Sequence, residues 1–340
     1  MLVSEIGEFG LISLLAREFG IEYPPKRSAR QGGLIVGLGD DAVVAPRQEG
    51  AMIWTTDTMV SGVHFLPERS RWNDVGWKAL AVNLSDIAAM GGEPQIALVT
   101  LALPVEFCVE DAVALYQGLH EAAVEYRVTL GGGDIVRSPV FSITVALSGV
   151  APAPRLGEPR VLTRSAARPG DVVAVSGTLG DAAGGVQLVT SSGAPEDEPR
   201  RRIRQAQERP RPRVELGREA VNGGIRCAID VSDGLVQDLR HVATASDIRL
   251  DVDANRIPIS DALREVFPAT AMGLALSGGE DYELVLIGPR PAIEALIETS
   301  RTPLTEIGEV TAGERYVLVT DEAGREIPQS AAGWDHFSSP

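Results

Sequence analysis

The sequence predicts a mixed α/β protein made of two domains. Its 340 residues exceed the length that one hydrophobic core usually serves. Apolar residues make up 44% of the chain, with Gly and Pro scattered along it, as in soluble globular proteins. Strand-like apolar runs alternate with segments of helical periodicity, which is typical of α/β and α+β folds with mixed sheets. We expect one domain over residues 1–150 and a second over residues 151–340.

In the first half, the spacing of apolar residues predicts helices over residues 4–19, 73–90 and 106–126. The first ends at Gly20, a residue that suits a helix C-terminus, and the second ends before Gly91, Gly92 and Pro94. Strands are expected at 34–38, 42–45, 52–56, 96–103 and 141–150. Residues 21–33 read as a basic loop.

In the second half, the Pro-, Gly- and Arg-rich residues 151–170 predict the connection between the domains. Strands at 171–176, 227–231 and 282–287 and helices at 180–190 and 233–246 follow. Residues 191–213 carry seven arginines interleaved with Glu, Gln and Pro. We interpret this segment as an exposed loop and a helix with a solvated arginine face.

Charge and composition exclude several classes of protein. The net charge of −16 argues against binding to nucleic acid or to an anionic membrane surface. The two cysteines, Cys108 and Cys227, lie far apart in apolar surroundings and predict reduced thiols. The N-terminus lacks a signal-peptide pattern, and no apolar run approaches the roughly 20 residues of a membrane span. A cytoplasmic location is expected.

Lone aspartates beside Gly, Thr and Ser recur through the chain and point to hard cations, which prefer carboxylate and phosphate oxygens. Asp86 is the sharpest case. It falls near the C-terminal end of a predicted helix, where the helix dipole disfavours a carboxylate by up to about 1 kcal/mol. Asn83 precedes it by three residues and shares its face. We favour a metal ligand here over the alternatives, an ion pair with a nearby arginine or the cap of a loop.

The other motifs each allow two readings. Asp40 and Asp41 suggest a metal ligand or an ordinary turn, and Thr55, Thr56 and Asp57 suggest hard oxygen ligands or a plain strand end. His64 is equally consistent with packing and with ligand contact. The triple glycine before Asp134 would let backbone N–H groups approach an anion, or would form a flexible turn. No Gly-Lys-Ser/Thr follows it, so a Walker A loop is excluded.

Two motifs in the second half belong to the same set. Asp230 interrupts an apolar strand end without an evident structural reason. Ser232 and Asp233 are also explained as the N-cap and first turn of the next helix. The run from Gly278 to Glu280 repeats the glycine-then-acid pattern, and the glycines between 177 and 185 suggest a phosphate site or a turn.

Taken in order, these motifs resemble the thiamine-monophosphate kinase family, part of the superfamily typified by aminoimidazole-ribotide synthetase. The matching segments are residues 37–42, 55–58, 62–65, 78–91, 131–134, 162–164, 229–235, 276–284 and 333–337. The resemblance implies the two-domain fold of that superfamily and ATP-dependent phosphorylation of thiamine monophosphate to thiamine diphosphate. It also implies that the N-terminal domain binds ATP and Mg²⁺ and forms a homodimer.

The resemblance also implies roles for individual residues. The Mg²⁺ ligands would be Asp41, Thr55, Thr56, Asp57, Asp86, Asp134, Asp230 and Asp233. ATP would contact Tyr116, Gly133, Asp134, Arg164 and Ser232. Thiamine monophosphate would contact His64, Glu280 and Trp334.

Charge explains why such a reaction needs metal ions. At about 4 Å and an effective dielectric constant near 20, each pair of unit charges on the two polyanions repels by roughly 4 kcal/mol. A protein of net charge −16 requires bound cations to offset this repulsion. The acceptor phosphate is mostly dianionic at pH 7, so we assign no general base and expect direct in-line transfer assisted by several Mg²⁺ ions.

Two alternatives remain at this point. Another ATP-dependent enzyme of the superfamily, such as a hydrogenase-maturation dehydratase or selenophosphate synthetase, would use a cysteine at a terminus or in an N-terminal loop. Cys108 and Cys227 occupy neither place. The other alternative is a nucleotide- or metal-binding protein without turnover, which an assay of ADP formation would distinguish.

Overall fold

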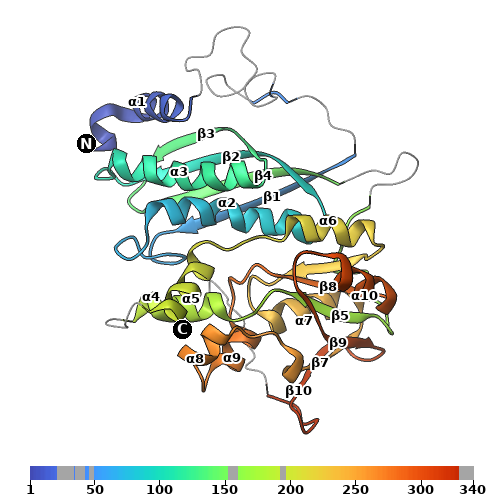
Figure 1. Cartoon of the computed structure of the whole chain (residues 1–340). Coiled ribbons are helices and arrows are strands. Elements are labelled where there is room, and N and C mark those ends of the chain that lie inside the picture. Colours follow the sequence, from blue (N-terminus) through green and yellow to red (C-terminus); the bar gives the residue numbers. More distant parts are fainter. Residues whose placement is uncertain (21–33, 35–42, 46–49, 152–159, 192–196, 329–340) are drawn as a thin grey trace. The chain divides into compact units, whose positions relative to one another are not determined.

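The computed structural model describes residues 1–20, 34, 43–45, 50–151, 160–191 and 197–328. The chain divides into two compact units (Figure 1). The first comprises Met1–Ile87 and Glu93–Pro159, and the second comprises Ala88–Gly92 and Arg160–Pro340. Each unit contains one mixed β-sheet, which confirms the predicted α/β class with mixed sheets.

The sheet of the first unit has the order β1-β4-β2-β3. Its strands are β1 (Ala51–Val60), β4 (Ser142–Ala151), β2 (Glu93–Leu103) and β3 (Thr129–Arg137). Helices α2 (Trp72–Ala89) and α3 (Val109–Glu125) lie on one face of this sheet, and α1 (Val3–Glu18) contacts α3 (Figure 1). In β2, Ala97, Val99 and Leu101 are buried while Leu98 and Thr100 are exposed, so the helices of the described residues cover one face of this sheet only.

Two glycines allow α2 and α3 to approach closely. A Cβ atom added at Gly118 would lie 1.7 Å from the carbonyl oxygen of Asn73, and one added at Gly76 would lie 1.9 Å from that of Leu115. Real Cβ atoms cannot approach so closely. The absence of a side chain at these positions therefore sets the helix–helix distance.

Several expectations for the first unit need correction. The triple glycine and Asp134 lie inside β3 and form no turn, because Gly132, Gly133 and Asp134 pair with consecutive residues of β2. The expected strand at 34–38 falls almost entirely outside the described residues. Residues 43–45 contribute only an isolated bridge residue, Val44, in place of the expected strand. Strand β1 runs four residues beyond the expected end at 56.

The sheet of the second unit has the order β10-β7-β9-β5-β8-β6. Its strands are β5 (Val172–Ser176), β6 (Cys227–Asp230), β7 (Arg249–Asp253), β8 (Leu284–Gly288), β9 (Leu304–Thr311) and β10 (Tyr316–Thr320). Every residue of β5, β6 and β8 is buried, so both faces of the sheet are covered at this end. This explains why these strands read as continuous apolar runs.

The helices of this unit are α4 (Asp181–Thr190), α5 (Glu198–Glu208), α6 (Val214–Asn222), α7 (Leu235–Ser246), α8 (Asp261–Val266), α9 (Ala271–Ser277) and α10 (Arg290–Thr299). The expected arginine-bearing helix is α5: Arg201 and Arg202 are exposed and pair with Glu198. Its other face is not solvated, because Ile203 and Gln207 are buried. Helix α6 was not expected from the sequence.

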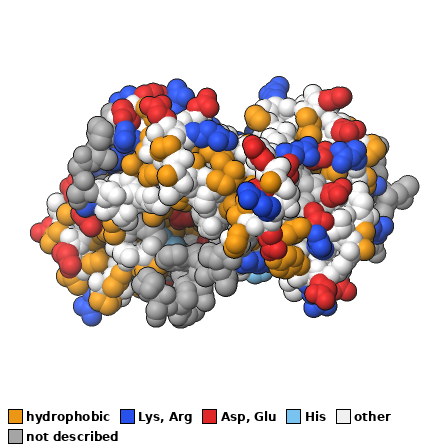
Figure 2. All heavy atoms as spheres, turned by 90° about the horizontal axis from the view of Figure 1, so that it is seen from below, with side chains coloured by type: hydrophobic (Ala, Val, Ile, Leu, Met, Phe, Trp, Pro, Cys, Tyr) orange, Lys and Arg blue, Asp and Glu red, His pale blue; other side chains and the backbone are white. Residues whose placement is uncertain are grey.

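Figure 2 shows one face of the molecule, on which Lys and Arg side chains of the described residues are interspersed with Asp and Glu. Among the described residues, no helix is long and apolar enough to cross a membrane.

Candidate functional site

The end of β6 and the turn that follows it carry three of the predicted site residues of the second unit. Asp230 is the last residue of β6 and is only 3% exposed. Beyond it the backbone stays paired, since Val231 N–H donates to Glu283 O at 2.8 Å and Tyr282 N–H donates to Val231 O at 2.9 Å. Ser232 and Asp233 come next, before α7 begins. The buried carboxylate of Asp230 thus lies at the end of a fully covered strand, as the sequence predicted.

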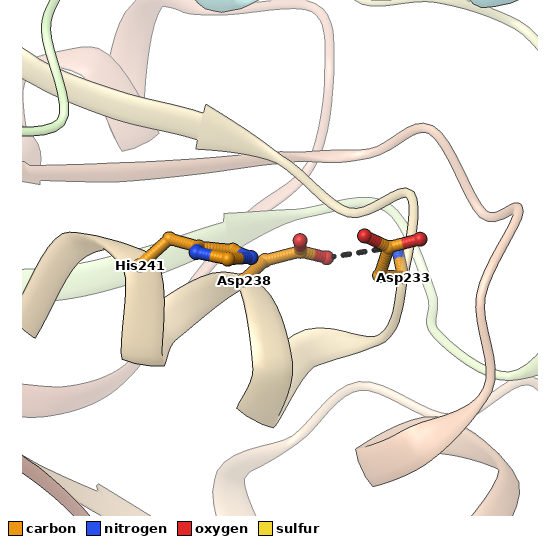
Figure 3. A group of neighbouring side chains, drawn as sticks. All are labelled: Asp233, Asp238 and His241. Carbon is orange, nitrogen blue, oxygen red and sulfur yellow. Dashed lines mark hydrogen bonds between the residues drawn. The ribbon is translucent and has the colours of Figure 1, made fainter. Parts of the chain in front are cut away.

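The side chain of Asp238 of α7 lies beside this turn and is hydrogen-bonded to it (Figure 3). Its Oδ2 accepts the backbone N–H groups of Ser232 at 3.1 Å and of Asp233 at 3.2 Å. The helix begins at Leu235, with Gly234 at the N-cap position in a left-handed conformation (φ 111°) and no side-chain cap. The reading of Ser232 and Asp233 as an N-cap is therefore wrong: Gly234 occupies that position, and Asp238 accepts their N–H groups.

Burial and neighbouring carboxylates act on the pKa of Asp238. Burial, followed by the negative charges of Asp230 and Asp233, raises the pKa of Asp238 to about 8. Oxygen atoms of Asp233 and Asp238 and a ring nitrogen of His241 lie within 4.8 Å of one another. The carboxylates of Asp230 and Asp233 suit Mg²⁺, which prefers oxygen ligands from carboxylates, water and phosphate. The residues present therefore fit the metal that the sequence predicts.

Glu280 is presented beside the same turn by a strained segment. Its N–H donates to Ser232 O at 2.9 Å, and its Oε2 accepts from Gln207 Nε2 of α5 at 3.4 Å. Glu280 has φ 71° and Tyr282 has φ 51°, in the left-handed region that side chains other than Gly seldom adopt. The structure thus brings Asp230, Ser232, Asp233 and Glu280 together in one unit.

The alternate acids of this segment, Asp281 and Glu283, anchor it. Asp281 accepts the N–H groups of Gly180 at 2.7 Å and Ala182 at 3.1 Å, at the start of α4. Burial raises the pKa of Asp281 well above its ordinary value, although these two N–H groups act in the opposite direction. Glu283 accepts from Arg213 and Ser176. Asp281 and Glu283 therefore fix the backbone of this segment. Glu280 is the third acid of the segment, and it is the one that the sequence resemblance assigns to substrate.

In the first unit, Thr55 of β1 and Asp86 of α2 are in direct contact, with Thr55 Oγ1 donating to Asp86 Oδ2. Asp86 lies in the last turn of α2, which ends at Ala89, as expected. The pairing register places Asp57 opposite Val145 and Thr55 opposite Leu147, both of them buried under the helices. Thr55, Asp57 and Asp86 therefore belong to the helix-covered side of the sheet.

Thr56 and Asp134 lie on the other face of this sheet. Thr56 alternates with Thr55 and donates to Val145 O at 3.1 Å. Asp134 is exposed and pairs in register with Thr100, which pairs with Thr144 and then Thr58. Three strand spacings, about 14 Å, separate β3 from β1. Within one chain the sheet therefore does not bring Asp134 to Asp57.

The remaining predicted residues occupy separate places. His64 is half-buried and its Nδ1 accepts the N–H of Val60 at 3.0 Å. Tyr116 of α3 lies near Phe19, with 6.3 Å between ring centroids, and burial raises the pKa of its phenol to about 12. Arg164 is exposed, and its carbonyl oxygen accepts from Ser246 Oγ at 2.7 Å. Gly133 lies in β3. Asp41 and Trp334 fall outside the described residues.

Sequence reasoning missed Asp238, His241 and Gln207. Asp238 and His241 are three residues apart, so they share one face of α7. Their positions, about one and two helical turns after Asp233, could have indicated that they lie near it. Gln207 gave no such signal, because it lies inside a segment whose composition indicates a solvated helix.

Two family models match the chain: the N-terminal domain of AIR synthase related proteins over residues 39–151 and the C-terminal domain over residues 168–321. The fold and the carboxylate-lined turns therefore define an AIR synthase related protein. The thiamine-monophosphate kinase of Escherichia coli O157:H7 is 38% identical over 98% of this chain and 99% of its own length. The chain belongs to the thiamine-monophosphate kinase family, which confirms the resemblance drawn from the motifs.

Solved structures agree with this assignment. The crystal structure of thiamine-monophosphate kinase from Stenotrophomonas maltophilia K279a is 37% identical, with a TM-score of 0.78 over 95% of this chain and 98% of that chain. The structure of AaThiL complexed with AMPPCP and TMP is 32% identical, with a TM-score of 0.76 over 99% of both chains. The superfamily fold implied by the motifs is thereby confirmed.

Proposed function

We propose that this protein is a kinase that transfers the γ-phosphoryl group of ATP to thiamine monophosphate, forming thiamine diphosphate in its biosynthesis. The observation that carries the proposal is the likeness, over 99% of both chains, to the AaThiL structure that holds AMPPCP and TMP. AMPPCP is a chemical analogue of ATP, which supports ATP as the co-substrate. The named kinase relative, matched over nearly its full length, supports the same activity.

The carboxylates are proposed to hold several Mg²⁺ ions. In the first unit these would bind Asp41, Thr55, Thr56, Asp57, Asp86 and Asp134, and in the second unit Asp230 and Asp233. Mg²⁺ would supply the positive charge that lets two polyanions approach. The pairing of Thr55 with Asp86 and the two N–H bonds to Asp238 fix the directions of these ligands before substrate binds, which supports the proposal.

Direct in-line transfer needs no general base, because the acceptor phosphate is already mostly dianionic at pH 7. The task of the protein is then to bind and align. We assign Tyr116, Gly133, Asp134, Arg164 and Ser232 to ATP. Glu280, held in a left-handed conformation beside Ser232, is assigned to thiamine monophosphate together with His64 and Trp334.

A homodimer is proposed to form through the uncovered face of the first sheet. Met52, Trp54, Leu98 and Val136 are between 38% and 68% exposed, and strand alternation and register place them on this face with Asp134. Exposed apolar surface of this kind marks an interaction site. A second copy is the proposed occupant, because two-fold pairing of identical faces would bring a second set of strand residues to Asp134, which its own sheet holds away from Asp57.

Sedimentation velocity tests the dimer. Trp54→Glu places a charge on the proposed interface and is expected to give a monomer, whereas Trp54→Phe keeps the apolar area and is expected to remain a dimer. A wild-type protein that sediments as a monomer at micromolar concentration would contradict the proposal.

The cytoplasm is the proposed location, in keeping with a biosynthetic role.

The activity is tested by measuring ADP formation with a panel of acceptors, with Mg²⁺ and with EDTA. We expect ADP to form when thiamine monophosphate is present and to disappear with EDTA, and thiamine diphosphate should appear in equal amount by chromatography. ADP release that does not depend on any acceptor would favour a nucleotide-binding protein or another ATPase of the superfamily.

A further inference from the structure

We propose that Asp238 is a positioning residue, which holds the backbone of the turn 231–234 so that Asp230 and Asp233 face a divalent cation together. The inference rests on the proposed function, because it takes these two aspartates as metal ligands. It assigns Asp238 no contact with substrate.

The first support is the bonding of the turn. One oxygen of Asp238, Oδ2, accepts two successive N–H groups, those of Ser232 and Asp233. Asp238 is 2% exposed, so neither bond exchanges readily with water. Two N–H groups directed at one oxygen fix the orientation of both peptide planes. The positions of Cα and Cβ in Asp233 follow from that orientation.

The second support is that the turn is clamped on its other side as well. Glu280 N–H donates to Ser232 O, and Val231 N–H donates to Glu283 O. A Cβ atom added at Gly234 would lie 2.7 Å from Ser277 O, and one added at Gly279 would lie 2.4 Å from Ser232 O. The segment 277–283 therefore blocks the turn from moving away from α7. On the opposite side of the turn, the Asp238 side chain of α7 accepts its two N–H groups.

The third support is proximity. A carboxylate oxygen of Asp238 and one of Asp233 lie within 4.8 Å of each other, and Asp230 ends the strand that leads into the turn. His241, one turn further along α7, brings a ring nitrogen within 4.8 Å of the Asp233 and Asp238 oxygens (Figure 3). His241 is exposed, which makes it a comparison residue: it belongs to the cluster but has no part in holding the turn.

The test measures Mn²⁺ binding to the full-length protein by electron paramagnetic resonance, without nucleotide or thiamine phosphate. Asp230→Asn identifies the portion of bound Mn²⁺ that belongs to this turn. Asp238→Ala removes the acceptor of both N–H groups, and its apparent Kd for that portion is expected to rise about 10- to 100-fold, as for other residues that orient metal ligands. Asp238→Asn keeps an oxygen at the Oδ2 position and is expected to change the Kd by less than about 3-fold.

Three results would overturn the proposal. Asp238→Ala with wild-type Mn²⁺ affinity would show that the turn needs no such support. If Asp238→Asn binds Mn²⁺ as weakly as Asp238→Ala does, the charge of Asp238 acts on the ion directly. If His241→Asn binds Mn²⁺ as weakly as Asp238→Ala does, the cluster of Asp233, Asp238 and His241 is itself the set of metal ligands.

A second measurement keeps the proposal testable if Asp238→Ala does not fold. Hydrogen–deuterium exchange of the peptide that covers residues 230–235 should be slow in both the wild type and Asp238→Asn; fast exchange in the wild type refutes the clamp. ADP formation with thiamine monophosphate is followed separately in the wild type. Its absence would refute the proposed function while the Mn²⁺ comparison still decides the role of Asp238.

Discussion

Replacing Arg213 with methionine tests how much the stability of the second unit depends on the ion pair between Arg213 and Glu283. Arg213 Nε donates to Glu283 Oε2 at 2.7 Å and its Nη2 donates to Oε1. The two side chains are 25% and 8% exposed. Ser176 Oγ also donates to the same carboxylate. Methionine keeps much of the length of the arginine side chain but leaves the Glu283 carboxylate without this cation.

The expected loss follows from the burial of Glu283. Removing one partner of a buried pair costs about 3–5 kcal/mol, because the remaining charge stays desolvated. Arg213 is a quarter exposed and Ser176 still donates, so the loss should fall at or just below the low end of this range. We expect the free energy of unfolding to fall by about 2–3 kcal/mol.

The assay is urea denaturation followed by circular dichroism, with Arg202→Met as the matched control. Arg202 pairs with Glu198 on the exposed face of α5, with side chains 70% and 57% exposed. Its loss should cost at most about 0.5 kcal/mol. Adding Glu283→Gln to Arg213→Met should recover part of the loss, because it removes the stranded charge. Equal losses for Arg213→Met and Arg202→Met would refute the reasoning.

Three further predictions concern the proposed metal ligands, a close helix contact and a buried carboxyl group. Asp57→Asn and Asp86→Asn should each abolish ADP formation without changing the circular dichroism spectrum; near-wild-type rates at saturating Mg²⁺ would contradict their assignment as metal ligands. Gly118→Ala should lower the urea midpoint by the equivalent of about 1–3 kcal/mol, since its Cβ would meet the Asn73 carbonyl, whereas Gly273→Ala, with open space around it, should not. Because burial raises the pKa of Asp281, its ionisation opposes folding above the unfolded pKa near 4. Wild-type stability should therefore fall relative to Asp281→Asn as pH rises from 5, by at most about 1.4 kcal/mol per pH unit, and urea midpoints at pH 5 and pH 8 that shift equally in both proteins would refute this.

The sequence predicted the buried strand ends well and the glycine-rich segments poorly. Asp230 stood out because a carboxylate in an apolar strand has no local explanation, and the structure places it at the end of the covered strand β6. The triple glycine before Asp134 suggested either a backbone that approaches an anion or a flexible turn. Pairing with β2 excludes the turn: a Cβ atom at Gly133 would lie 1.7 Å from Val99 O, so glycine is required within the strand.

The support around the candidate site could not be predicted from local patterns. Asp238, Gln207 and Glu283 act through partners that lie 5 to 107 residues away in the sequence. Ser232 and Asp233 matched a helix N-cap pattern, and only the left-handed Gly234 and the reach of Asp238 exclude it. Motif spacing identifies ligand candidates, whereas the residues that orient them depend on tertiary contacts.

The left-handed conformations of Glu280 and Tyr282 have a consequence for engineering. Among the described residues with positive φ, only four are not glycine, and two of them lie in this short segment. Each such residue costs about 1–2 kcal/mol relative to an unstrained one, and glycine would recover part of this, because its own loss of backbone entropy on folding offsets the rest. A laboratory selection for thermostability alone would therefore be drawn to these two positions and would remove the side chain proposed to contact thiamine monophosphate. Libraries built on this protein should hold positions 280 and 282 constant.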